Sequence, residues 1–217
     1  RWGMALFRDR AHAGRELAAA LEPYAGREGL IVLGLPRGGV PVAAEVARAL
    51  GAPLDVLVVR KLGVPGHEEL AMGAVASGGG VVLNDDVVAH LGVPAAAVRQ
   101  EVEREQAEVA RREAAYRGDR PPLDLRGATA LLVDDGVATG ATVLAAVQAA
   151  RAAGASEVVV AVPVGAPDSL ARIAREADDV VCPQRPRALR SVGEWYLDFA
   201  QTSDEEVRQA LAAAASA

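Results

Sequence analysis

A loop of small and hydroxylic residues follows an apolar run in the stretch LLVDDGVATGAT, residues 131–142. Gly140 can adopt the positive φ of a tight turn, and the hydroxyl groups of Thr139 and Thr142 can donate hydrogen bonds to an anion. An apolar helical pattern begins directly after the loop, and the free N–H groups at a helix N-terminus also favour an anion. The stretch therefore predicts a phosphate-binding loop composed of Ala138, Thr139, Gly140, Ala141 and Thr142.

The two acids before this loop, Asp134 and Asp135, need a separate explanation because carboxylates repel a phosphate. Successive residues of a strand point to opposite faces, so regular strand geometry turns at most one of them toward a ligand. Carboxylates beside an anion site are suited to accept hydrogen bonds from ligand hydroxyls or to bind a bridging Mg²⁺. The structural alternative is that one acid caps the helix and the other is solvated. A sugar phosphate accounts for the acids and the loop together.

A second loop of this kind lies within LGLPRGGVPVAAEVA, residues 33–47. An apolar run leads into Arg37, Gly38 and Gly39, and a helical pattern follows. Arginine can contact a phosphate through two nitrogen atoms at once. An ordinary Gly-Gly turn is the structural alternative. Together with the first loop, the pattern indicates a second anion site.

Arg60 and Lys61 follow a third apolar run, and Lys61 is the only lysine of the chain. At the carboxyl end of a parallel strand these cations would face the same ligand. A solvated pair at a strand end is the alternative. The segment 62–69 that follows is predicted to be a loop that could close over the site as a lid.

A parallel sheet would bring these residues together, because ligands of such sheets bind outside the carboxyl ends of the strands. Continuous apolar runs alternate with helical patterns, which is typical of strands covered on both faces. The sequence predicts a doubly wound, mainly parallel α/β sheet with helices on both faces. Expected strands are 30–35, 54–59, 128–133, 158–164 and 180–182, and expected helices are 12–21, 39–50, 142–153 and 169–177.

Two additions to this core are expected. A short antiparallel pair, 70–75 and 81–83, precedes an amphipathic helical arm at about 94–118. A small hood lobe is expected from 183 to 217, where a capping box begins a final helix at Ser203. We expect a single domain over residues 1–217, with its core at about 28–182.

The composition excludes several classes of function. A formal net charge of -6 argues against a nucleic-acid-binding protein. No apolar segment is long enough for a membrane span, so a cytoplasmic protein is expected. Cys182 is the only cysteine, and its apolar surroundings predict a buried structural thiol.

The stretch 131–142 resembles the signature of the type I phosphoribosyltransferases, in which an apolar strand leads into two acids and a Thr-Gly-x-Thr loop. The charged arm and the sequence WYLDF at 195–199 make the chain similar to uncharacterised bacterial phosphoribosyltransferase-like proteins. The resemblance implies a Mg²⁺-dependent glycosyltransferase of nucleotide metabolism. Such an enzyme moves the 5-phosphoribosyl group from 5-phosphoribosyl 1-pyrophosphate to a nitrogenous base and releases pyrophosphate. A regulatory protein or sensor that binds this donor, or a hydrolase of the donor, are the alternatives.

The resemblance also implies roles for the candidate residues. Asp134 and Asp135 would hold the ribose hydroxyls, one of them with Mg²⁺, and residues 138–142 would wrap the 5-phosphate. The second loop resembles the family's pyrophosphate loop, in which a non-proline cis peptide often occurs, and the bond beside Arg37 is the candidate here. The residues expected to face the pyrophosphate are Arg37, Gly38, Gly39, Arg60 and Lys61, and those expected to act in catalysis are Asp134, Asp135, Lys61 and Arg37.

The acceptor base is usually held by a variable hood in this family. Here the hood contains Trp195, Tyr196 and Phe199, which could stack on a base, and Asp198, which could accept its N–H groups. Packing in the core is the alternative. The 6-oxopurine enzymes commonly carry an Asp where this chain has Ala138, which argues against hypoxanthine or guanine as the acceptor. Family analogy and the amphipathic arm also suggest a homodimer.

Overall fold

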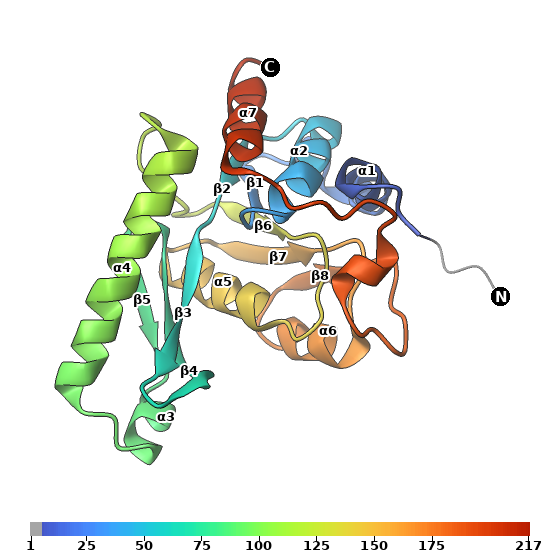
Figure 1. The fold of residues 1–217 in the computed structure, drawn as a ribbon. Coiled ribbons are helices and arrows are strands. Elements are labelled where there is room, and N and C mark those ends of the chain that lie inside the picture. The colour runs from blue at the N-terminus through green and yellow to red at the C-terminus, as the bar shows by residue number, and fades with distance from the viewer. Residues whose placement is uncertain (1–5) are drawn as a thin grey trace.

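A parallel sheet of five strands forms the centre of the protein (Figure 1). The computed structural model describes residues 6–217. The strands lie in the order β2-β1-β6-β7-β8, and each neighbouring pair is parallel. Their bounds are β1 Leu30–Gly34, β2 Leu54–Val56, β6 Thr129–Val133, β7 Glu157–Ala161 and β8 Asp179–Val181. The predicted parallel sheet is confirmed, and the carboxyl ends of its strands share one edge.

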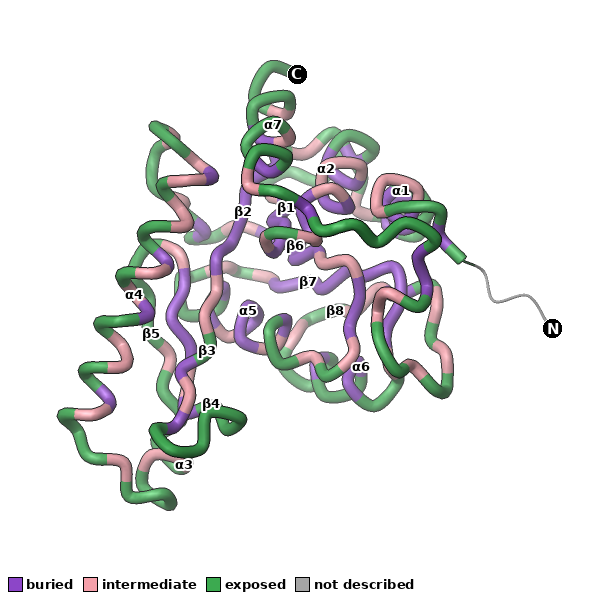
Figure 2. Tube along the Cα trace, in the orientation of Figure 1, coloured by how far each residue is buried: buried purple, intermediate pink, exposed green. Residues whose placement is uncertain are grey.

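Helices cover both faces of this sheet, which confirms the doubly wound fold. Along β6, Leu131 and Val133 belong to the apolar cluster on one face, whereas Leu132 belongs to the cluster on the other. Figure 2 shows the burial of β6 and β7 that results. The helices on the first face are α1 Arg10–Ala20, α2 Gly39–Leu50 and α7 Asp204–Ala215, and those on the second face are α5 Ala141–Ala152 and α6 Pro167–Ala174.

The third apolar run is divided between two sheets, so the single strand predicted at 54–59 is wrong. After β2 the chain leaves the parallel sheet, and a three-stranded antiparallel sheet begins at β3. The sequence does not mark this change because Leu57 and Val58, at the junction, are as buried as the strands around them. The segment 62–69, predicted to be a loop, is the β-hairpin where β3 turns into β4. The strands of the second sheet are β3 Val59–Val64, β4 His67–Ala76 and β5 Gly80–Leu83, and the predicted antiparallel pair is found as β4 and β5.

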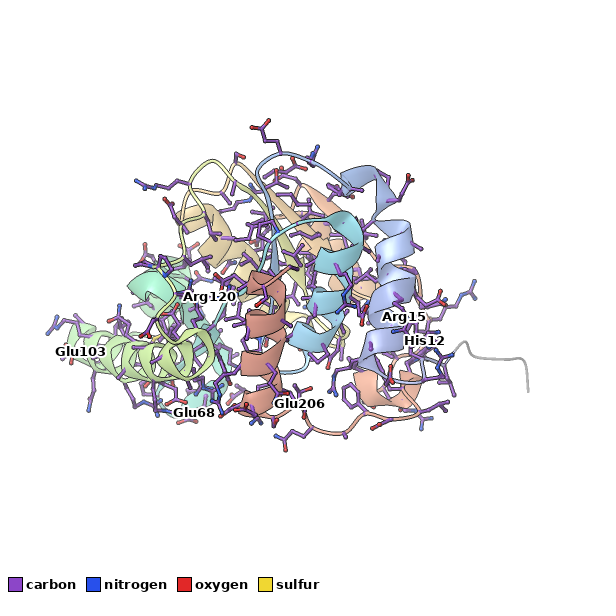
Figure 3. The ribbon with its side chains drawn as sticks, turned by 90° about the horizontal axis from the view of Figure 1, so that it is seen from above. His12, Arg15, Glu68, Glu103, Arg120 and Glu206 are labelled. Carbon is purple, nitrogen blue, oxygen red and sulfur yellow. The ribbon has the colours of Figure 1, made fainter. Side chains whose placement is uncertain are left out.

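The predicted amphipathic arm is the helix α4, which spans Ala95–Arg117 and follows the short helix α3, Asp85–His90. Val98 and Val109 are buried on its apolar face. The arm packs against the antiparallel sheet and against α7. Seen from above, α7 lies between α4 and α2, and α1 lies beyond α2 (Figure 3).

A buried ion pair joins the end of the arm to the edge of the parallel sheet. Asp55 of β2 accepts hydrogen bonds from Arg117 Nε at 2.9 Å and from Arg117 Nη2 at 3.0 Å. Arg120 lies 3.6 Å from the same carboxylate and donates to the carbonyl oxygen of Leu211 in α7 at 2.7 Å. The Arg117 side chain is only 8% exposed, so its charge depends on Asp55 for compensation.

The segment after β8 has little regular structure until α7 begins. Phe7 pairs with Tyr196 through a single bridge, which places this segment beside the N-terminal region. The predicted capping box at Ser203 is confirmed, because its side chain accepts from the Glu206 N–H and the Glu206 side chain accepts from the Ser203 N–H. Single-turn helices complete the fold: η1 Glu22–Tyr24, η2 Ser77–Gly79 and η3 Val192–Trp195.

Cys182 is buried as predicted, and burial raises the pKa of its thiol to about 11. The thiol is therefore protonated and unreactive at neutral pH. Within residues 6–217, no helix combines the length and the apolar character that crossing a membrane requires.

Candidate active site

The two predicted loops meet at the carboxyl edge of the parallel sheet. They follow the neighbouring strands β1 and β6. A Cβ atom built on Gly39 would lie 2.6 Å from the Val133 carbonyl oxygen and 3.0 Å from Asp134 Cα, and one built on Gly38 would overlap Asp135 Oδ2. Only glycine permits so close an approach of this loop to the acids. The sequence patterns around residues 37 and 135 thus belong to one site.

The predicted phosphate loop leads directly into the N-terminus of α5. Gly140 is the N-cap of α5 and has φ 81°, which confirms the left-handed turn. Two side chains of α6 hold this loop: Ser169 Oγ donates to the Ala138 carbonyl at 2.6 Å, and Arg172 Nη2 donates to the Thr139 carbonyl at 3.0 Å. Because these carbonyls point toward α6, we expect the N–H groups of the loop to face the other side, where an anion can bind.

The acid pair lies beyond Val133, the last residue of β6, so the alternation of a regular strand does not apply to it. Asp134 Oδ1 accepts a hydrogen bond from the Asp135 N–H at 2.9 Å, and Asp135 Oδ2 accepts one from Arg10 Nε at 3.1 Å. Burial raises the pKa of both carboxyl groups; the charge of Asp135 raises the pKa of Asp134 further, and Arg10 opposes the rise at Asp135. Ionising both acids is therefore unfavourable unless a cation or hydrogen-bond donors are present.

Arg10 is a residue of this site that the sequence analysis missed. It is the first residue of α1, and its side chain is 12% exposed. Besides Asp135, it donates through Nη1 to the Ala200 carbonyl at 2.6 Å, and its Cζ atom lies 4.1 Å from the centre of the Phe199 ring. Arg10 therefore connects the acid pair to the segment before α7.

Replacing Arg10 with Met is expected to raise the pKa of Asp135, because the cation that opposes the effect of burial is removed. A pH titration of the carboxyl ¹³C signals in the ligand-free protein would measure this change. Arg10→Lys retains the positive charge and is the matched control, for which we expect a smaller rise. Identical titrations of Asp135 in wild type and Arg10→Met would contradict the prediction.

The hood aromatics occupy different environments. Trp195 and Tyr196 are each 6% exposed and share an apolar cluster with Phe7, so most of their surface serves packing. The Tyr196 hydroxyl donates to the Asp135 carbonyl oxygen at 2.6 Å. Phe199 is 37% exposed and is the more accessible ring. Asp198 Oδ1 accepts from the Ala200 N–H at 3.0 Å, which stabilises its own turn.

Arg37 is placed on the side of its loop that faces α7. The Pro36–Arg37 peptide bond is cis, as predicted for the bond beside this residue. The guanidinium Nη1 lies 3.7 Å from Asp204 Oδ1, and 39% of the Arg37 side chain is exposed. The backbone of Gly38 and Gly39 thus borders the acids, while the Arg37 side chain extends toward the start of α7.

Arg60 and Lys61 do not lie at the end of a parallel strand, so that predicted location is wrong. Both belong to β3 of the antiparallel sheet. Arg60 Nε donates to the buried Glu105 of the arm at 2.7 Å. This ion pair gives Arg60 a structural role, because it joins β3 to the arm. Lys61 lines a cavity of about 590 Å³ that extends to Ala141, the first residue of α5. Lys61 of the antiparallel sheet and the end of the predicted phosphate loop therefore line the same cavity.

The acid pair can contribute to a metal site but does not form one alone. Within residues 6–217, no cluster of three or more His, Cys, Asp or Glu side chains could hold a metal ion. Mg²⁺ in proteins is often held by one or two carboxylates together with the phosphates of a substrate. One oxygen of each acid is already hydrogen-bonded, which leaves Oδ2 of Asp134 and Oδ1 of Asp135 for such a role. These residues fit a Mg²⁺ that arrives with a phosphorylated ligand.

Comparison with known proteins agrees with this geometry. The family described as "Phosphoribosyl transferase domain" matches residues 7–90 and 74–198. Two proteins of Mycobacterium tuberculosis, from strains CDC 1551 and H37Rv, are provisionally named phosphoribosyl transferases and are 55% identical over 205 residues. The match covers 94% of this chain but only 46% of those proteins, so the chain spans about half their length. The crystal structure of TT1426 from Thermus thermophilus has 45% identity and a TM-score of 0.87, and the match covers 95% of this chain and 97% of that one.

Proposed function

Because the chain belongs to the phosphoribosyl transferase domain family, we propose that it transfers the 5-phosphoribosyl group of 5-phosphoribosyl 1-pyrophosphate to a nitrogenous base. The observation that carries this proposal is the close approach of Gly38 and Gly39 to the acid pair, which itself leads into the loop 138–142 at the same edge of the sheet. One loop suits the 5-phosphate, the acids suit ribose hydroxyls, and the other loop suits the pyrophosphate. A single donor molecule would therefore use all three features.

In the proposed reaction, the bond between ribose C1 and a pyrophosphate oxygen breaks, and its electrons leave with the pyrophosphate. A nitrogen lone pair of the base forms the new C1–N bond, and that nitrogen loses a proton. The transition state has oxocarbenium character. The carboxylates of Asp134 and Asp135 would hold the hydroxyls and offset the positive charge that develops on the ring. Mg²⁺, when bound with the donor, supplies positive charge that stabilises the leaving pyrophosphate.

The 5-phosphate and the pyrophosphate of the donor would be held mainly by backbone N–H groups. For the 5-phosphate, the N-terminus of α5 supplies these donors, together with the Thr139 and Thr142 hydroxyls. For the pyrophosphate, the Gly38 N–H at the N-cap of α2 would supply a donor, whereas the Gly39 N–H already donates to the Leu35 carbonyl oxygen at 3.0 Å. Arg37 would have to exchange its long contact with Asp204 for one with the donor.

The acceptor is proposed to bind beside the segment before α7. Phe199 has the exposure that a stacking ring needs, and Ala138 argues against a 6-oxopurine. Trp195 and Tyr196 are buried and would not contact the base, and Tyr196 packs against Phe199 with their ring centres 5.0 Å apart. A homodimer is proposed by family analogy alone.

Lys61 is proposed to stabilise the leaving pyrophosphate. We expect Lys61→Ala to lower kcat by about 100-fold while the Kd for the donor changes by less than about threefold, because charge on the leaving group develops only in the transition state. Lys61 is exposed on β3, so its loss should leave the fold intact. Steady-state kinetics and donor titration would measure both quantities, with Lys61→Arg as the charge-retaining control. Equal losses in kcat and donor affinity would refute a role in the leaving step.

A direct test incubates the protein with donor, Mg²⁺ and a panel of bases and follows pyrophosphate release. Release that depends on one base supports the transferase. Release without any base would instead identify a hydrolase, and donor binding with no release would identify a sensor. Asp135→Asn is the control for activity from contaminating enzymes, because it changes a residue of the proposed site.

A further inference from the structure

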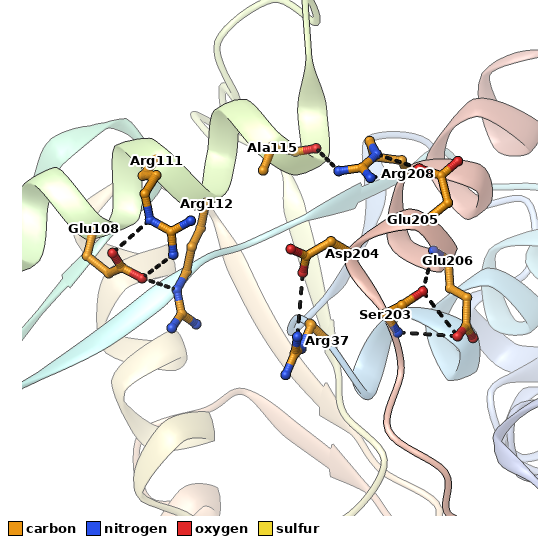
Figure 4. Close-up of polar contacts among 10 residues, drawn as sticks. All are labelled: Arg37, Glu108, Arg111, Arg112, Ala115, Ser203, Asp204, Glu205, Glu206 and Arg208. Carbon is orange, nitrogen blue, oxygen red and sulfur yellow. Dashed lines mark hydrogen bonds and ion pairs between the residues drawn. The ribbon is translucent and has the colours of Figure 1, made fainter.

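A small basic cavity lies outside the acid pair, where the loop after β1 meets the arm and the start of α7 (Figure 4). Its volume is about 120 Å³. Cavities for drug-sized ligands measure about 300–1,000 Å³, so this one suits a single small group. Its lining consists of Arg37, Arg111, Arg112, Ala115, Tyr116 and Asp204.

Several nitrogen donors around this basic cavity are unused. Glu108 binds Arg111 through both Nε and Nη2, at 3.0 and 2.7 Å, but it binds Arg112 only through Nε, at 2.7 Å. Within residues 6–217, the two Nη groups of Arg112 donate no hydrogen bond, and neither does the Arg37 guanidinium. Arg112 is half-buried and Arg37 is exposed, and both lie on the cavity wall.

The charges at the basic cavity are only loosely compensated. Three guanidinium groups face two carboxylates, those of Glu108 and Asp204. The contact of Arg37 with Asp204, at 3.7 Å, is too long for a hydrogen bond, unlike the 2.9 Å contact of Asp55 with Arg117. A pair that served only to hold two elements together would be expected to be short and buried. Burial and the neighbouring Asp204 raise the pKa of Tyr116, so its hydroxyl stays protonated.

We propose that the basic cavity binds a phosphate group through Arg37 and Arg112, with Asp204 displaced from Arg37 when the phosphate enters. Guanidinium groups match the geometry of phosphate oxygens, and charge-assisted hydrogen bonds are stronger than the long ion pair that they replace. The site shares Arg37 with the proposed pyrophosphate loop but does not depend on transfer activity. The phosphate could belong to the donor's pyrophosphate or to a separate phosphorylated ligand.

The test uses inorganic pyrophosphate at low ionic strength and follows the arginine Nε–H signals by ¹⁵N NMR. This readout separates the basic cavity from the loop at 138–142, which also suits phosphate. In wild type we expect the Nε–H signals of Arg112 and Arg37 to shift as pyrophosphate is added and to stop shifting once the site is saturated. Shifts confined to residues around 138–142, with Arg112 unmoved, would overturn the proposal even if the donor binds and the transferase is active.

Three variants sharpen the test. Arg112→Gln should weaken the binding monitored at Arg37 by about 10-fold, as expected for the loss of charge-assisted hydrogen bonds. Asp204→Asn should strengthen it several-fold, because the competing charge is removed while the Ser203 cap remains. Arg104→Gln is the matched control: Arg104 lies on the same helix and binds Glu101 through Nε and Nη2, but it does not line the cavity. Equal effects of Arg112→Gln and Arg104→Gln would also overturn the proposal.

Adding 5-phosphoribosyl 1-pyrophosphate with Mg²⁺ identifies the source of the phosphate. We expect the donor to compete with pyrophosphate at Arg112, because Arg37 belongs to both the loop and the cavity. Simultaneous binding without competition would support the cavity as the site of a separate phosphorylated ligand. Wild-type thermal stability in all three variants would show that the changes in binding are local.

Discussion

Asp134→Asn is expected to lower the affinity for the donor by about 10- to 100-fold and, at pH 8, to make the ligand-free protein more stable to heat. The affinity should fall because Asp134 is proposed to accept hydrogen bonds from the ribose hydroxyls in its ionised form. The stability rises because burial and the charge of Asp135 make ionised Asp134 unfavourable in the folded protein. Asn can still accept the Asp135 N–H through its side-chain oxygen.

The pH dependence of this difference follows from the sign of the pKa change. The folded protein holds the Asp134 proton more tightly than the unfolded chain, whose carboxyl has its ordinary pKa near 3.8. Wild type is therefore destabilised as the pH rises from that value through the higher folded pKa, and the full penalty is present above it. The stability advantage of Asp134→Asn should be greatest at pH 8 and should disappear as the pH falls toward 4.

Thermal unfolding across this pH range, together with donor titration by calorimetry, would measure both effects. Asp119→Asn makes the same change of charge at an exposed position of the chain and should alter neither quantity. If Asp134→Asn proved less stable than wild type at pH 8, the electrostatic account of the acid pair would be wrong.

Asp55→Ala is expected to lower the free energy of unfolding by about 3–5 kcal/mol. The substitution removes both hydrogen bonds that Arg117 donates to the carboxylate and leaves a guanidinium that is only 8% exposed without a counter-charge. Arg120 loses the same partner. Because these arginines join the arm and α7 to β2, the loss should affect the whole fold.

Chemical denaturation would measure this change. Asp124→Ala removes a carboxylate from the pair with Arg126, whose side chains are 56% and 82% exposed, and should have little effect on stability. The double substitution Asp55→Leu with Arg117→Met should recover much of the lost stability, because an apolar pair needs no compensation for charge. A loss below about 1 kcal/mol for Asp55→Ala would mean that water compensates Arg117.

The parallel sheet and its two loops could be predicted from the sequence because their signals are local. The helix predicted at 39–50 has the observed bounds, Gly39–Leu50, since a glycine turn begins it and Gly51 in the left-handed conformation ends it. The order of apolar runs and helical patterns was sufficient to place both loops at one edge. Contact between the Gly38–Gly39 turn and the acid pair then followed from the pairing of β1 with β6.

The remaining parts of the site depend on contacts between distant residues. Arg10 and Asp135 are 125 positions apart, and nothing local distinguishes Arg10 from the other arginines. Ser169 and Arg172 looked like ordinary residues of a helix until the fold placed them against the phosphate loop. The division of 54–59 between two sheets was hidden for a similar reason, because burial on either sheet selects the same apolar residues.

The hydrogen bonds around Asp135 join residues that the ribosome produces at very different times. Its carboxylate is bound by Arg10, its carbonyl by Tyr196, and Arg10 in turn by Ala200. A ribosome that has translated only as far as α6 has already produced both glycine loops and Arg10, but not Tyr196 or Ala200. The nascent chain therefore contains both loops and the acid pair before it contains the residues whose hydrogen bonds hold Asp135 and Arg10 from the C-terminal side.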